Sequence, residues 1–252
     1  MLLFDKFTIE ENSEMLEKWQ YDAFLHFKNK LMDDDKKFPC IPAVQGYKLN
    51  HFRFGFVSDP TKPSAHQELA QLLTLFGRKS HSFGSYTSLV IFFETTESLI
   101  GNYEIEQYRE LFWGILNQLS KMDEEKWPEH IPVDPNHHIW EYCFGGEQYF
   151  MYCATPAHKN RKSRSFPYFI FAVTPRWVLE RFNSFPQSAA KIKKSIRERI
   201  KAYDTVNVHP DLNGYRQENN FEWKQYFLSD DESTPSKCPF TYMKNLLRGS
   251  RY

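Results

Sequence analysis

The segment from Ile139 to Cys153 constrains the fold more than any other part of the chain. It places two short aromatic runs, IWEYCF and QYFMYC, on either side of Gly145, Gly146 and Glu147. Glycine reaches the positive φ angles that tight hairpin turns require. A phosphate-binding loop would need a helix directly after the glycines, and EQYFMY is typical of a strand. The segment therefore predicts an antiparallel β-hairpin.

Other strands and helices alternate irregularly around this hairpin. Three further strands are predicted over YKLNHFRFGFV (47–57), SLVIFFE (88–94) and YFIFAV (168–173). Apolar residues at helical spacing predict a first helix that starts near Ser13 and continues to Phe27, and further helices over residues 69–76, 108–119 and 189–204. TPRWVLERF predicts a helix capped by Thr174 with Pro175 at its first position, and EWKQYFL (222–228) predicts a late strand. We therefore predict an α+β fold, a single domain over residues 1–252, with a mixed or antiparallel sheet covered by helices.

Composition narrows the functional class. The 32 basic and 32 acidic residues balance, which argues against a general affinity for nucleic acid or an anionic membrane. Aromatic residues make up 17% of the chain, which indicates a thick apolar interior or a pocket for a flat apolar group. The four cysteines are sparse, and the N-terminus becomes charged at Asp5 without an apolar leader. A cytoplasmic protein with reduced thiols is expected.

The loop TPAHKNRKSR (155–164) follows the hairpin and carries the strongest candidate site residues. The imidazole of His158 is a candidate ligand for a metal or a haem iron. Arg161 and Arg164 present guanidinium groups that bind carboxylates or phosphates in a bidentate manner. Glu147, at the mouth of the hairpin, is a candidate contact for a cationic substrate. The alternative for all four residues is a solvated loop and turn with no ligand.

Weaker candidates lie elsewhere. His138 and Cys40 are alternative ligands. Cys143 and Cys153 are interpreted as core thiols rather than zinc ligands, because the chain has no Cys-x-x-Cys pair. The basic helix over residues 191–201 suits either an acidic partner or solvent.

Seven short motifs occur in an order that resembles the YqcI/YcgG family, and together they span Phe38 to Phe240. They are FPC (38–40), FGGEQYF (144–150), TPAHKNRKSR (155–164), SIRERIKAYD (195–204), HPDLNGY (209–215), EWKQYFLSDD (222–231) and CPF (238–240). The wider group includes haem-dependent N-hydroxylases of guanidino compounds, of the arginine N-hydroxylase and guanitoxin-pathway types. The resemblance thus implies haem b (heme b), dioxygen, an electron donor and a small guanidino or amine substrate.

Combined with the loop, the resemblance predicts that His158 is the axial ligand and that Arg161 and Arg164 pair with the haem propionates. Glu147 would contact the substrate. Cys40 and His138 remain open as iron ligands. A non-enzymatic protein that binds haem or a small anion is the alternative function, and a hydrolase that uses Cys40 or Cys153 with a histidine ranks last.

Overall fold

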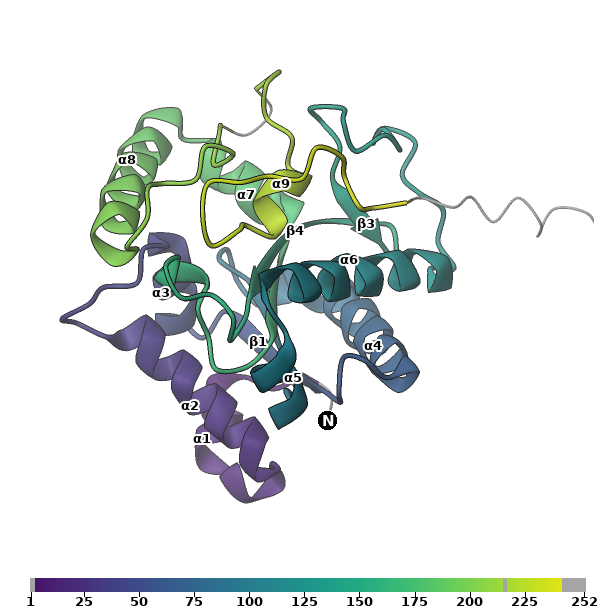
Figure 1. The fold of residues 1–252 in the computed structure, drawn as a ribbon, viewed down its shortest axis with the longest axis vertical. Helices are drawn as coiled ribbons and strands as arrows, with labels where there is room; N and C mark the ends of the chain where they lie inside the picture. Colours follow the sequence, from purple (N-terminus) through teal and green to yellow (C-terminus); the bar gives the residue numbers. More distant parts are fainter. Residues whose placement is uncertain (1–2, 215–216, 242–252) are drawn as a thin grey trace, which may run out of the picture.

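The computed structural model describes residues 3–214 and 217–241 of the chain (Figure 1). Within this part, five strands form one sheet in the order β1-β2-β5-β4-β3. The strands are β1 (Phe52–Val57), β2 (Ser88–Phe93), β3 (Tyr142–Phe144), β4 (Glu147–Ala154) and β5 (Ile170–Pro175). β1 pairs with β2 in parallel, and the other three pairings are antiparallel. The predicted α+β class with a mixed sheet is therefore confirmed.

Helices cover both faces of the sheet. They are α1 (Lys6–Glu11), α2 (Lys18–Met32), α3 (Ile41–Lys48), α4 (Pro63–Lys79), α5 (Glu97–Asn102), α6 (Ile105–Met122), α7 (Arg176–Asn183), α8 (Pro186–Tyr203) and α9 (Trp223–Tyr226). The helices α4 and α6 pack on one face, while α2 and α3 pack on the other (Figure 1). No helix in the described ranges combines the length and the apolar character needed to cross a membrane.

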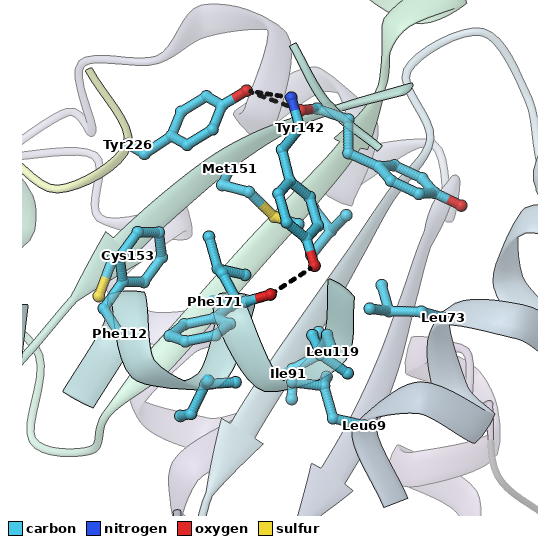
Figure 2. Close-up of a cluster of buried hydrophobic side chains, with 14 of the residues drawn as sticks. Leu69, Leu73, Ile91, Phe112, Leu119, Tyr142, Met151, Cys153, Phe171 and Tyr226 are labelled. Atoms are coloured by element: carbon cyan, nitrogen blue, oxygen red, sulfur yellow. Dashed lines mark hydrogen bonds between the residues drawn. The ribbon is translucent and has the colours of Figure 1, made fainter. Parts of the chain in front are cut away.

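The first face carries a closely packed aliphatic and aromatic core. The side chains that it shares with α4 and α6 include Leu69, Leu73, Ile91, Phe112, Leu119 and Phe171 (Figure 2). Successive residues of a strand point to opposite faces, so Phe171 and Val173 of β5 face this core. Ala172 and Thr174 of the same strand consequently point to the second face.

The second face is built largely from phenylalanine rings. The ring centroids of Phe24 and Phe54 lie 5.2 Å apart, and those of Phe27 and Phe92 lie 5.8 Å apart, both edge to face. This geometry is favourable for aromatic pairs and fixes α2 against β1 and β2. This packing leaves a cavity on the second face, lined by residues of α2, α3, α7 and α8.

The predicted hairpin is confirmed. Tyr142 of β3 pairs with Tyr149 of β4, and Phe144 pairs with Glu147. Gly145 and Gly146 form the turn with φ angles of 61° and 76°. Two consecutive positive φ angles are typical of the type I′ turn, which is why glycine occupies both positions.

Three local predictions were wrong. Residues 47 and 48 end α3, so the strand expected over 47–57 begins only at Phe52. EWKQYFL contains the short helix α9 instead of a strand. Thr174 belongs to β5, and Pro175 is the N-cap of α7, so the predicted cap was one residue early.

Candidate functional site

His158 is buried and both of its ring nitrogens are hydrogen-bonded within the protein. Nε2 lies 2.9 Å from the carbonyl oxygen of Leu228, and Nδ1 lies 2.8 Å from the hydroxyl of Thr155. A carbonyl can only accept, so Nε2 carries the proton and the Thr155 hydroxyl donates to Nδ1. Burial lowers the pKa of His158 to about 4, and the ring is neutral at pH 7. An iron ligand at this position would have to give up one of these bonds, and its role as axial ligand stays a prediction.

Arg161 uses its guanidinium group to hold backbone carbonyl groups. Its Nε donates to the carbonyl of Ser229 at 2.7 Å, and its Nη2 donates to that of Asp231 at 2.6 Å. The carboxylate of Asp204 lies 3.7 Å from Nη1. Arg161 thus fastens the C-terminal segment, defined here as residues 220–231, to the loop 155–164.

Arg164 makes a similar set of contacts one turn further along. Its Nη1 donates to the carbonyl of Tyr226 at 2.8 Å, and its Nη2 donates to that of Gln225 at 2.9 Å. Its guanidinium carbon lies 4.1 Å from the ring centroid of Tyr152. Propionate binding by Arg161 and Arg164 stays a prediction, since the structure shows both side chains engaged with the backbone.

The structure separates Glu147 from the other three predicted site residues. Glu147 begins β4, whereas His158 lies beyond the other end of that strand. An eight-residue strand is roughly 23 Å long, at about 3.3 Å per residue over seven steps. Glu147 also approaches Gly77 of α4 on the first face of the sheet. A single site cannot include Glu147 and the loop 155–164 in this arrangement.

A cavity of about 380 Å³ lies on the second face of the sheet. This volume falls within the range of roughly 300–1,000 Å³ that is usual for small-molecule sites. Its walls come from the second face of the sheet, from α2, α3, α7 and α8, and from Asn213, Asn220, Glu222 and Gln225. The apolar wall includes Phe27, Phe38, Phe52, Phe150, Tyr152 and Phe182. None of Glu147, His158, Arg161 and Arg164 lines this cavity, but Cys40 does.

Cys40 is the N-cap residue of α3, so its thiol lies where the backbone amides of a helix begin. Burial raises the pKa of this thiol, while the amide of Ala43 and the guanidinium group of Arg164 oppose that shift. Burial raises the pKa of Tyr152, and the nearby Cys40 adds to this shift. The net effect on Cys40 is a raised pKa, so its thiol is neutral at pH 7.

Two lysines add positive charge to the cavity wall. Lys30 donates to the carbonyl groups of Lys162 and Ser165, each at 2.9 Å. Burial lowers the pKa of Lys30 to about 8. Lys193 donates to the Asn183 side chain at 2.6 Å. These ammonium groups could hold the carboxylates of a ligand.

A network of buried charges borders the opposite part of the cavity, next to Phe150 and Thr174. Arg176 Nε lies 2.8 Å from Glu141, and Arg176 Nη2 pairs with Glu222. The hydroxyl of Tyr226 lies 2.9 Å from the same oxygen of Glu222. Arg176 and Glu222 line the cavity. Sequence reasoning missed both, because Arg176 lies inside the predicted helix TPRWVLERF and Glu222 begins the predicted strand EWKQYFL.

The remaining candidates lie away from the cavity. The rings of His137 and His138 stack with centroids 4.7 Å apart in the loop before β3. Cys153 is buried in the first face, and Cys143 is buried in β3 with its Sγ 3.4 Å from the carbonyl oxygen of Glu141. Burial raises the pKa of both thiols. Across residues 3–214 and 217–241, no three His, Cys, Asp or Glu side chains are grouped to hold a metal ion.

The fold and cavity define an α+β protein with a cavity of small-molecule size on one face of a mixed sheet. The chain belongs to the YqcI/YcgG family, which it matches over residues 27–241. It is 48% identical to the uncharacterized protein YqcI of Bacillus subtilis (strain 168) over 249 residues, which cover 99% of this chain and 98% of YqcI. It is 46% identical to the uncharacterized protein YcgG of the same organism over 244 residues, or 97% of this chain and 96% of YcgG.

A more distant relative has a more informative name. The chain is 28% identical over 239 residues to the "Putative N(omega)-hydroxy-L-arginine synthase DcsA" of Streptomyces lavendulae. The match covers 92% of this chain and 88% of DcsA. No solved structure was found to match the chain.

Proposed function

We propose that this protein is a haem-dependent oxygenase that hydroxylates a nitrogen of a small guanidino or amine substrate. The observation that carries the proposal is a cavity walled by aromatic rings, with one thiol on its wall, in a relative of DcsA. The name of DcsA implies the conversion of an N–H group of L-arginine to N–OH.

The residues that line the cavity fit a haem. A porphyrin supplies four nitrogen ligands of its own, so the protein needs to supply only one or two. In this proposal Cys40 would supply the thiolate that binds the iron, which requires the metal to displace the thiol proton that burial favours. Lys30 and Lys193 would hold the propionates, and the aromatic wall would exclude water. When bound, haem would supply dioxygen activation, in which N–H becomes N–OH and the second oxygen atom leaves as water, with two electrons from an external donor and two protons from solvent.

Absorption spectra of protein purified from haem-supplemented cells test the cofactor and its ligand. We expect a Soret band in the wild-type protein and its loss in Cys40→Ala. Cys238→Ala is the matched control, because Cys238 is also partly buried but does not line the cavity. His158→Ala should retain a thiolate-type spectrum when reduced and treated with carbon monoxide. Loss of the band in His158→Ala, with retention in Cys40→Ala, would instead assign the iron to the loop 155–164.

Turnover then separates an enzyme from a binding protein. Haem-loaded protein is supplied with dioxygen, a reductant and a panel of guanidino compounds and amines that includes L-arginine. Mass spectrometry should detect a product heavier by one oxygen atom. A haem-loaded protein that forms no such product would support a sensor or carrier, and a wild-type protein that takes up no haemin would end the haem proposal.

A further inference from the structure

We infer that Glu222 is the carboxylate that binds the cationic nitrogen group of the substrate in this cavity. The inference rests on the proposed function, because it names the residue that a guanidinium or protonated amine meets there. Glu222 precedes α9 in the C-terminal segment and is 5% exposed.

The charges on the cavity wall single out this residue. Among the described residues that line the cavity, Glu222 is the one acidic side chain, whereas Lys30, Arg176 and Lys193 are basic. A cation that leaves water for an apolar cavity needs an opposite charge and hydrogen-bond acceptors to compensate for lost hydration. Within the described wall, Glu222 alone offers a carboxylate for this purpose.

The existing contacts of Glu222 fix its position without using all of its acceptor capacity. Arg176 Nη2 and the Tyr226 hydroxyl both contact the same oxygen, Oε1. An ionised carboxylate has two oxygens and about four acceptor positions. A guanidinium group or an ammonium group can therefore bind to a carboxylate that is already held in place. The amide side chains of Asn220 and Gln225, joined by a hydrogen bond of 2.6 Å, lie on the same stretch of wall and add polar contacts.

The surroundings of Glu222 make its proton sensitive to such a ligand. Burial raises the pKa of Glu222 to about 7, Glu141 adds to the shift, and Arg176 and Tyr226 oppose it. The Tyr226 hydroxyl also lies 3.0 Å from the carbonyl of Tyr149. When Glu222 is charged, the Tyr226 hydroxyl donates its single proton to the carboxylate. When Glu222 is protonated, Glu222 donates to the Tyr226 oxygen, and the Tyr226 hydroxyl donates to the carbonyl of Tyr149 instead. A cationic ligand favours the charged form, so binding releases a proton.

The test compares two ligands that differ in charge at the nitrogen end. L-Arginine carries a guanidinium group and L-citrulline carries a neutral ureido group of similar shape. Isothermal titration calorimetry on the purified protein, with its haem content recorded, should give a Kd for L-arginine at least about tenfold below that for L-citrulline. Glu222→Gln should remove most of this preference and leave the Soret absorbance per protein unchanged. Glu218→Gln is the matched control, since it makes the same change on an exposed residue four positions earlier.

A second measurement needs no variant, in case Glu222→Gln fails to fold. The Kd for L-arginine in the wild-type protein should fall about tenfold between pH 6 and pH 8, as Glu222 loses its proton, while that for L-citrulline stays constant. Equal Kd values for L-arginine in the wild type and Glu222→Gln, or no pH dependence, would overturn the inference. If haem-loaded protein binds L-arginine and L-citrulline with equal Kd values, the assigned role of Glu222 is wrong and the haem proposal stands. If protein that takes up no haem binds L-arginine through Glu222, the assigned role of Glu222 stands and the haem proposal is wrong.

Discussion

At the scale of single residues, His158 shows how burial and hydrogen bonding decide what a side chain can do. Its ring joins the loop 155–164 to the carbonyl of Leu228, and the ring of Phe227 lies with its centroid 5.6 Å away. A charged imidazole at this place would have lost its hydration, so burial keeps it neutral. Protonation of His158 should therefore oppose folding.

The sign of this effect follows from the two pKa values. His158 has a pKa of about 4 when folded and its ordinary value of 6.5 when unfolded, so the unfolded chain binds more protons between these pH values. The part of the free energy of unfolding that depends on a neutral His158 is fully present above pH 6.5 and is lost as the pH falls toward 4. The loss is on the order of 3 kcal/mol, at about 1.4 kcal/mol per pKa unit.

Urea unfolding of the wild type and His158→Gln at pH values from 4 to 7 measures this contribution. The difference between the two proteins should shrink as the pH falls, because the variant has no imidazole to protonate. The raised pKa of Glu222 gives an opposite slope in the same range, but it is common to both proteins and cancels in the difference. A constant difference across this range would contradict the assigned cause.

The sequence identified the candidate site only in part, and single residues explain why. The FPC motif brought Cys40 forward as an alternative ligand, and the structure places it on the cavity wall. Glu222 could not be identified from the sequence, because nothing in EWKQYFL shows whether its single glutamate is buried or exposed to solvent. The charges of the loop 155–164 made it a candidate site. However, Arg161 and Arg164 donate hydrogen bonds to backbone carbonyls, and no sequence pattern predicts these partners.

At the scale of elements, the β3–β4 hairpin depends on its two glycines for backbone conformation alone. A Cβ atom at Gly145 or Gly146 would meet no atom within 4 Å, so packing does not require glycine there. The positive φ angles do require it, because a side chain in this region strains the backbone.

Gly146→Ala should therefore lower the free energy of unfolding by about 1 kcal/mol, through backbone strain without a steric clash. Gly114→Ala is the matched control: it lies exposed in α6, where a Cβ atom also meets no neighbour. Alanine is favoured over glycine inside a helix, so this change should raise the free energy of unfolding by about 0.5–1 kcal/mol. Thermal or urea unfolding measures both, and equal signs for the two variants would refute the conformational explanation.

Long periodic elements were predictable and short ones were not. The apolar spacing in α4 and α6 continues over several turns, so it identified the helices without tertiary information. The four residues of α9 are too few to distinguish a helical period from a strand period. Their conformation is set by burial of Trp223 and Tyr226 against the first face of the sheet, which only the folded chain provides.

At the scale of the whole molecule, the C-terminal segment joins parts of the chain that are distant in sequence. The carboxylate of Asp230 accepts hydrogen bonds from the backbone amides of Lys159, Asn160 and Arg161 at distances of 2.8–3.1 Å. Arg161 and Arg164 return bonds to carbonyls of the segment. The loop and the segment therefore stabilise each other.

Asp230→Ala should loosen the loop 155–164 and the C-terminal segment together. Three amides lose a charged acceptor, and hydrogen bonds to charged groups have a net contribution of about 1.5–3 kcal/mol each where they are shielded from water. Hydrogen exchange should become faster at residues 159–161 and at residues 225–231 together. Asp35→Ala, an exposed aspartate in the loop after α2, is the control and should change neither region. Faster exchange in the loop alone would show that the segment is held by other contacts.

The cavity draws its walls from residue 27 through residue 225, and the stretch that holds Glu222 is among the last of them to be made. A nascent chain that has emerged only as far as β5 has the thiol of Cys40 but lacks α7, α8 and the Glu222 wall. A ribosome must therefore synthesise the chain as far as Gln225 before any ligand can be enclosed. We expect the cavity to be filled only after residue 225 has been synthesised, and any truncation ahead of residue 213 to leave it open on one side.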